Sequence, residues 1–295
     1  MTEPSPDLPS PDLPSSVLAS LDAGVPDPGR RSTVTAAGVP FSSLQWGEPR
    51  ARPLLLIHGV TASARIWWRI GPALATTGRR VIAVDLPGHG LTGHWPGHQR
   101  FRDNAANVAA WIHAAGLATP DLQVVGHSWG AMTAAALPRA GVRPGTLVLL
   151  DPPAISRAIL AGMVRQAEGQ LETDPITAAE RLRAENPSWS GVDIEAKAEA
   201  MAQLDREAAR AVLLDNGDWD GGLADLADPA AAGVPTWIIR GDPTIGGMLP
   251  DAALPPFEAL IGADHVITLL GAPHAPQRTH PIELTQALLH ALGGS

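Results

Sequence analysis

The chain has 295 residues, 45% of them hydrophobic and 17% charged, which is enough for one large α/β domain or for a core domain that carries an insertion. Its net charge of -9 argues against a nucleic acid or an anionic membrane as a partner, because both require a basic surface. The chain contains no Cys, which excludes disulfides and thiolate metal sites.

The N-terminal segment repeats the sequence Ser-Pro-Asp-Leu-Pro. It has neither the basic start nor the apolar run of about 7–15 residues that defines a signal peptide. Residues 1–30 are therefore predicted to form a disordered tail rich in Pro and Ser. No later stretch reaches the ~18 uninterrupted apolar residues of a membrane span. We expect a cytoplasmic protein.

From about residue 32, apolar runs alternate with segments of helical spacing. Strands are expected on both sides of a turn at Gly38, in the segments 52–59, 79–90, 122–128 and 145–153, before Asp242, and at 266–270. Helices are expected in the segments 65–78, 101–116, 129–140 and 279–292. This alternation predicts a mostly parallel sheet covered on both faces, with any ligand at the carboxyl ends of the strands.

Ser128 stands in the sequence Gly126-His127-Ser128-Trp129-Gly130, just after a predicted strand and just before a predicted helix. In that position the G-x-S-x-G pattern is typical of a nucleophile elbow, a tight turn in which the glycines leave room beside the serine. The following helix directs backbone N–H groups and its positive dipole end toward an anion formed there. Ser128 is therefore predicted to be a nucleophile and not a serine of an ordinary loop.

Four blocks in this order, LLLIHGVTAS, VIAVDLPGHGLTG, VVGHSWGA and LLGAPHAP, resemble the α/β-hydrolase superfamily. The likeness runs from about residue 32 to the C-terminal helix. It implies an α/β-hydrolase fold, with a mostly parallel eight-stranded sheet flanked by helices and a helical cap inserted. It also implies an oxyanion hole made by the backbone amides of Val60 and Trp129, which would stabilise a developing negative charge.

A serine nucleophile needs a base and an acid, and their chain order in this superfamily is serine, acid, histidine. His274 is the expected base because it directly follows the last predicted strand, whereas His280 falls at the start of the last helix. The resemblance places the acid after the strand that ends on Gly241, which selects Asp242. Asp151, at the end of the preceding strand, is the alternative. The weaker candidates are Asp251 and Asp264.

The strand rhythm is interrupted by long helical patterns between the sixth strand and the one before Asp242. Such an insertion resembles the helical cap of the superfamily. The predicted organisation is a tail at 1–30, a core at 31–153 and 233–295, and a cap at 154–232.

Three tryptophans are expected to line the substrate pocket, namely Trp67, Trp189 and Trp219. Trp67 follows the expected oxyanion loop, although the sequence does not separate it from its neighbour Trp68. Trp189 and Trp219 stand at loop-like breaks of the cap. An apolar, Trp-rich pocket favours a small hydrophobic carboxylic ester or a lactone as the substrate.

The predicted mechanism is an acyl-enzyme on Ser128, with His274 as general base and then general acid. Two alternatives stay open on the same fold: hydrolysis of a carbon–carbon bond in a ring-cleavage product, and binding of a small ligand without turnover. No cofactor is needed for any of these. A homo-oligomer is compatible with the sequence.

Two features imitate metal sites. The segment NGDWDGG resembles part of a calcium loop but lacks the Glu that would complete it. His89, His94 and His98 lie in a Gly-rich stretch, whose spacing gives no fixed ligand geometry. We therefore expect no metal.

Overall fold

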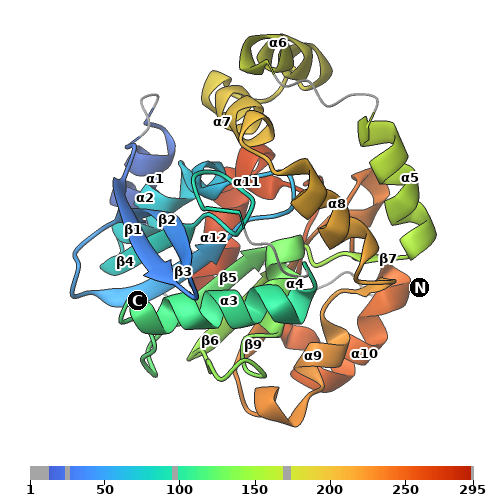
Figure 1. Cartoon of the computed structure of the whole chain (residues 1–295). Helices are drawn as coiled ribbons and strands as arrows, with labels where there is room; N and C mark the ends of the chain where they lie inside the picture. Colours follow the sequence, from blue (N-terminus) through green and yellow to red (C-terminus); the bar gives the residue numbers. More distant parts are fainter. Residues whose placement is uncertain (1–12, 24–26, 95–98, 169–173, 294–295) are drawn as a thin grey trace.

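An eight-stranded sheet forms the centre of the computed structural model, which describes residues 13–23, 27–94, 99–168 and 174–293 (Figure 1). Its strands are β1 (Arg30–Ala36), β2 (Val39–Trp46), β3 (Arg52–Ile57), β4 (Arg79–Val84), β5 (Gln123–His127), β6 (Thr146–Leu150), β9 (Thr236–Gly241) and β10 (Val266–Leu269). They lie in the order β1-β2-β4-β3-β5-β6-β9-β10. The pairs β1–β2 and β2–β4 are antiparallel and the other pairs are parallel. The predicted mostly parallel, eight-stranded α/β fold is confirmed.

Helices cover both faces of this sheet (Figure 1). They are α1 (Ser15–Leu21), α2 (Ile70–Ala75), α3 (Phe101–Ala114), α4 (Trp129–Ala135), α10 (Leu254–Ile261), α11 (Pro276–Thr279) and α12 (Pro281–Ala291). Successive residues of a strand point to opposite faces. Accordingly, Leu55 and Ile57 of β3 pack with α3 and α4, while Leu54 and Leu56 pack with α2 and α12. Continuous apolar strands are therefore needed here, because both faces are buried.

An insertion of mainly helical structure separates β6 from β9. It contains α5 (Arg157–Glu168), α6 (Pro175–Glu185), α7 (Gly191–Ala202), α8 (Arg206–Leu214) and α9 (Leu223–Leu226). Two short strands, β7 (Ala154–Ile155) and β8 (Trp219–Asp220), pair antiparallel at its base. In Figure 1, α6 and α7 stand apart from the sheet at the top of the molecule.

Part of the expected N-terminal tail is ordered, which corrects that prediction. Residues 1–12 lie outside the described residues, but α1 packs on the sheet domain with Leu13, Val17 and Leu21 buried. Val17 and Leu21 are four residues apart, so they share one face of α1 and bury it against α2 and α12, while Leu13 precedes the helix. Within the described residues, no helix is long and apolar enough to cross a membrane.

Candidate active site

Ser128 lies in a sharp turn between β5 and α4. Its φ angle of 57° is in the left-handed region, which residues with a side chain rarely adopt. Only glycine fits at positions 126 and 130, because a Cβ atom there would collide with the backbone. A Cβ on Gly126 would lie 2.2 Å from the carbonyl oxygen of Gly130, and a Cβ on Gly130 would lie 2.5 Å from that of His58. The turn therefore depends on these two glycines, and it presents the serine at the carboxyl end of β5.

His274 follows β10 and reaches Ser128 across the end of the sheet. Its Nε2 lies 2.9 Å from Ser128 Oγ, and its Nδ1 lies 2.5 Å from Oδ2 of Asp151. Because a carboxylate only accepts hydrogen bonds, Nδ1 carries the proton and Nε2 accepts from the serine hydroxyl. In this tautomer the imidazole can take up the hydroxyl proton, as a general base must.

The carboxylate beside His274 belongs to Asp151, the first residue after β6. Asp151 is completely buried. Its Oδ1 accepts from the backbone N–H of Gly241 and its Oδ2 from that of Met248, each at 3.0 Å. The first donor is the last residue of β9 and the second lies in the loop after it, and together with His274 they compensate the buried charge.

Asp242, the expected partner of His274, does not contact it. Its Oδ1 accepts from the hydroxyl of Thr244 at 2.6 Å and from the backbone N–H of the same residue at 2.9 Å, while Oδ2 accepts from Gly271 N–H at 3.0 Å. The Thr244 hydroxyl, followed by the Gly271 N–H, lowers the pKa of this carboxyl. The prediction of Asp242 is wrong because its side chain turns back to cap the 3₁₀-helix η3 (Pro243–Ile245).

The buried His127, which is itself held by the buried Gln277, fixes the backbone of His274, and neither residue was predicted from the sequence to belong to the site. The Nε2 of His127 donates to the carbonyl oxygen of His274 at 2.8 Å, and its Nδ1 accepts from Gln277 Nε2 at 3.2 Å. Burial, reinforced by the nearby His274, lowers the pKa of His127 well below its usual value, so the ring is neutral. The one sequence signal for His127 was its place directly before Ser128.

The loop after β3 passes beside the nucleophile. A Cβ on Gly59 would lie 3.4 Å from Ser128 Oγ, so the backbone at Gly59 is close to the serine. Val60 follows Gly59, and Trp129 follows Ser128. Among the interactions of the described residues, neither the Val60 nor the Trp129 backbone N–H donates a hydrogen bond.

Two buried histidines support this loop. His58 Nε2 accepts from Leu86 N–H at 3.0 Å, so its Nδ1 donates to the carbonyl oxygen of Gly59 at 2.8 Å. His89 Nε2 lies 2.6 Å from the carbonyl oxygen of Val60. Burial lowers the pKa of both rings to about 4. The loop is therefore held by rings that are neutral near pH 7.

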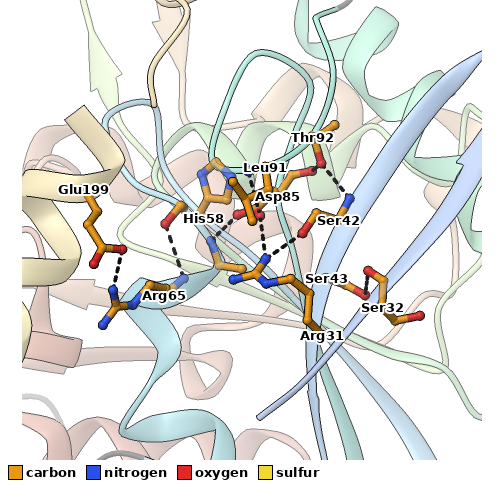
Figure 2. A network of polar contacts seen from close by, with 12 residues as sticks. Arg31, Ser32, Ser42, Ser43, His58, Arg65, Asp85, Leu91, Thr92 and Glu199 are labelled. Carbon is orange, nitrogen blue, oxygen red and sulfur yellow. Dashed lines mark hydrogen bonds and ion pairs between the residues drawn. The ribbon is translucent and has the colours of Figure 1, made fainter. Parts of the chain in front are cut away.

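Asp85, which directly follows β4, connects the start of the 3₁₀-helix η1 (Ala64–Trp67) to Arg31 of β1 (Figure 2). Its Oδ1 accepts from Ala64 N–H at 2.7 Å, its Oδ2 accepts from Leu91 N–H at 3.2 Å, and the Arg31 guanidinium lies 3.6 Å away. Burial raises the pKa of this carboxyl, against the effect of these donors. Asp85 thus ties the loop after β4 to the start of η1, which is a structural role.

Two of the three expected pocket tryptophans lie in the core. Trp67 is fully buried with the side chains under β3, and Trp219 is 4% exposed with its ring edge-on to Phe101 at 5.1 Å. Packing in the core takes up both rings, and their role in lining a pocket stays a prediction. Trp189 lies at the boundary between the insertion and the core, where the Arg278 guanidinium stacks on its ring at 4.5 Å.

Trp68 is the residue of its pair that faces the insertion. Its Nε1 donates to Oδ1 of the buried Asp193 at 2.8 Å, which joins η1 to α7. Lys197 of α7 donates to the carbonyl oxygen and to the hydroxyl of Thr61, at 2.8 and 2.6 Å. The insertion therefore contacts the core at Thr61, next to Val60, and at Trp68 after η1.

The described part of the chain contains no group of three or more His, Asp or Glu side chains arranged to hold a metal ion. His89 is engaged with backbone carbonyl oxygens, and His94 pairs with Asp205. His98, the third member of the stretch considered above, lies outside the described residues.

The fold and this arrangement are those of an α/β hydrolase. The family model for the alpha/beta hydrolase fold matches residues 52–277, and the chain belongs to this family.

Relatives and solved structures agree with that assignment. The chain is 27% identical to lipase LipV of Mycobacterium tuberculosis, over 84% of this chain and 96% of that protein. It is 28% identical to the pimeloyl-[acyl-carrier protein] methyl ester esterase of Sodalis glossinidius, over 80% and 92%. The solved structure of E-2-(acetamidomethylene)succinate hydrolase superposes with a TM-score of 0.73 at 21% identity, covering 90% of this chain and 99% of the other.

Proposed function

We propose that this protein is a serine hydrolase that cleaves a hydrophobic carboxylic ester or a lactone through an acyl-enzyme on Ser128. The observation that carries the proposal is the continuous hydrogen-bonded series from Asp151 through His274 to Ser128 Oγ. The lipase and the methyl ester esterase among the relatives support an ester as the substrate.

In the proposed reaction, His274 Nε2 accepts the hydroxyl proton while Ser128 Oγ attacks the ester carbonyl carbon. Asp151 keeps the proton on Nδ1 and stabilises the imidazolium that forms. The imidazolium then protonates the leaving alcohol oxygen, and the acyl group stays on Ser128. Water, deprotonated by the same imidazole, releases the acid. In a lactone the alcohol and the acid are the two ends of one product.

The tetrahedral intermediate carries a negative oxygen that needs donors. We assign this role to the backbone N–H groups of Val60 and Trp129, as the sequence predicted. The close approach of Gly59 to Ser128 and the absence of another acceptor for either amide among the described residues support the assignment. Donors already fixed in place stabilise such an oxyanion by several kcal/mol in serine hydrolases, about 3–4 for one donor.

We assign the insertion at residues 154–232 the role of a cap over this site. The contacts of Trp68 with Asp193 and of Lys197 with Thr61 support this role, since they join α7 to the segment that runs from Thr61 to the end of η1. The substrate would then enter between α7 and the carboxyl ends of β3 and β5.

A fluorophosphonate probe tests the nucleophile without requiring the natural substrate. We expect one covalent adduct, mapped to Ser128, that is lost in Ser128→Ala and strongly slowed in His274→Ala. His280→Ala is the matched control, because His280 contacts Thr279 and not the serine, and it should label at the wild-type rate. A folded protein without an adduct would refute the proposal and favour ligand binding without turnover.

A further inference from the structure

Two cationic side chains meet where the insertion covers the core. Lys197 projects from α7 onto Thr61, and Arg278 of α11 stacks on Trp189. They are close enough for the charge of Arg278 to help lower the pKa of Lys197 to about 7, with desolvation as the larger cause. Desolvation also lowers the pKa of Arg278, to about 10. Both side chains are only partly exposed.

Of the nearby acids, Asp193 lies close enough to Arg278 for its charge to raise the pKa of that guanidinium. Within the described part of the chain, no carboxylate oxygen forms a salt bridge with Lys197 or Arg278. The acids nearby are used elsewhere. Asp193 accepts from Trp68 and Ser190 and pairs with Arg69, while Glu199 pairs with Arg65.

Two partly buried cations without a salt bridge destabilise a folded protein unless other groups compensate their charge. Desolvated cations are normally paired with an anion or held by several hydrogen-bond acceptors. Lys197 has two acceptors, both on Thr61, and the Arg278 side chain has the face of Trp189 but no hydrogen bond to any described residue. Stacking leaves the in-plane N–H groups of the guanidinium free to donate.

The two cations lie close to residues that neighbour the candidate catalytic centre. Thr61 is next to Val60, one of the two proposed oxyanion donors. Arg278 is four residues after His274, and its charge contributes to the lowered pKa of His127, which precedes Ser128. An acyl group bound to Ser128 and extending beneath α7 would therefore meet both cations.

We infer that Lys197 and Arg278 recognise a carboxylate on the substrate, so that the preferred ester or lactone carries a second, ionised acid group. The inference rests on the proposed function and narrows it to anionic substrates. Arg278 supplies the planar donor set that suits a carboxylate, and Trp189 fixes the plane of that donor set. Lys197 supplies a point charge from the insertion, so binding of the anion would also draw α7 toward the core.

The test compares half-esters of dicarboxylic acids with neutral esters of the same acyl length, both as 4-nitrophenyl esters. At low salt we expect the wild-type protein to have the higher kcat/KM for the half-ester. Arg278→Gln and Lys197→Gln should lower that preference by about 10- to 100-fold, mainly through KM, and change the neutral ester by less than about threefold. The glutamine at 197 can still donate to Thr61, which preserves the loop. Arg139→Gln removes one charge at the distant pair with Asp228, and it should leave the preference unchanged.

A second measurement separates this inference from the proposed reaction. Calorimetric titration of Ser128→Ala with adipate does not depend on turnover, and we expect binding that weakens when Arg278→Gln is added. If fluorophosphonate labels Ser128 but the protein neither prefers the half-ester nor binds adipate, the carboxylate site is refuted and the proposed hydrolase activity is not. Adipate binding without labelling would overturn the hydrolase and leave the anion site. An equal loss on both ester classes in folded variants would show that these residues only support structure.

Discussion

Replacing Asp151 by Asn tests which acid holds the base. The two carboxyl oxygens of Asp151 accept three hydrogen bonds, from His274 Nδ1 at 2.5 Å and from two backbone N–H groups at 3.0 Å. In Asp151→Asn one oxygen becomes an NH₂ group. If the NH₂ group faces His274, the imidazole must place its proton on Nε2, where it can no longer accept from Ser128.

The size of the effect follows from this change of tautomer. Loss of the correct tautomer in a serine triad lowers kcat by about 10,000-fold, which is roughly 5 kcal/mol of activation free energy. The NH₂ group also faces at least one N–H donor in either orientation, so we expect a loss of about 1–3 kcal/mol in the free energy of unfolding. Activity must therefore be measured on protein shown to be folded.

Asp242→Asn is the matched control, because it makes the same chemical change at the acid that the sequence favoured. Its carboxylate serves Thr244 and Gly271, so we expect kcat within about threefold of the wild-type value. The assay is the initial rate of 4-nitrophenyl ester hydrolysis together with the rate constant of fluorophosphonate labelling. A full loss in Asp242→Asn with activity retained in Asp151→Asn would refute the assignment.

Three further predictions concern the scaffold of the site. Burial lowers the pKa of His58 and His89 to about 4 in the folded protein. In the unfolded chain both rings are protonated already near pH 6.5, so the free energy of unfolding falls as the pH is lowered from about 6.5 to about 4. Over this range we expect each ring to lower the free energy of unfolding, measured by urea, by roughly 3 kcal/mol. His89→Gln should make this free energy depend less on pH, and an unchanged dependence would contradict the prediction. Gly130→Ala would place a Cβ 2.5 Å from a carbonyl oxygen and should cost more than about 2 kcal/mol in the free energy of unfolding. Gly191→Ala, whose Cβ meets nothing within 4 Å, should leave that free energy unchanged or higher, and equal losses in the two variants would be inconsistent with the steric argument. Trp68→Phe removes the donor to the buried Asp193 and should lower the free energy of unfolding by about 1–3 kcal/mol. Urea unfolding measures this loss, and proteolysis around α7 should become faster. Wild-type stability would show that this hydrogen bond does not hold the insertion.

The parts of the site that could be predicted from the sequence are those with a local signal. Ser128 was found because its neighbouring glycines are needed for one turn between one strand and one helix. His274 was found because it follows the last strand of the sheet directly. Both signals are contained within a few residues, so they do not depend on how distant strands are arranged.

The acid lacked such a signal. Asp151 and Asp242 both directly follow a strand, and both precede a proline. What distinguishes them is the order of strands, since β6 is the neighbour of β5 while β9 lies one strand further away. The end of β9 and the loop after it then donate two N–H groups to Asp151, whereas Asp242 accepts from Thr244 in its own loop and from Gly271 after β10.

The positions of the tryptophan rings also depend on contacts between residues that are distant in the sequence. Trp67 and Trp68 are adjacent, yet the first packs into the core and the second donates to α7. In a 3₁₀ turn, neighbouring residues point in directions about 120° apart, so the start of η1 decides which ring is buried. The start of η1 depends on Asp85, which bonds the Ala64 N–H from another strand.

An acyl-enzyme on Ser128 distinguishes nucleophilic catalysis from ligand binding without turnover, and mass spectrometry of the protein detects it. The protein would be mixed with 4-nitrophenyl acetate, quenched in acid within the first turnovers, and digested to locate the added mass. We predict an acetyl group on the peptide that contains Ser128, formed with a burst of 4-nitrophenol and absent from Ser128→Ala. Steady hydrolysis without any acetylated Ser128, or with the acetyl group on another residue, would contradict the mechanism.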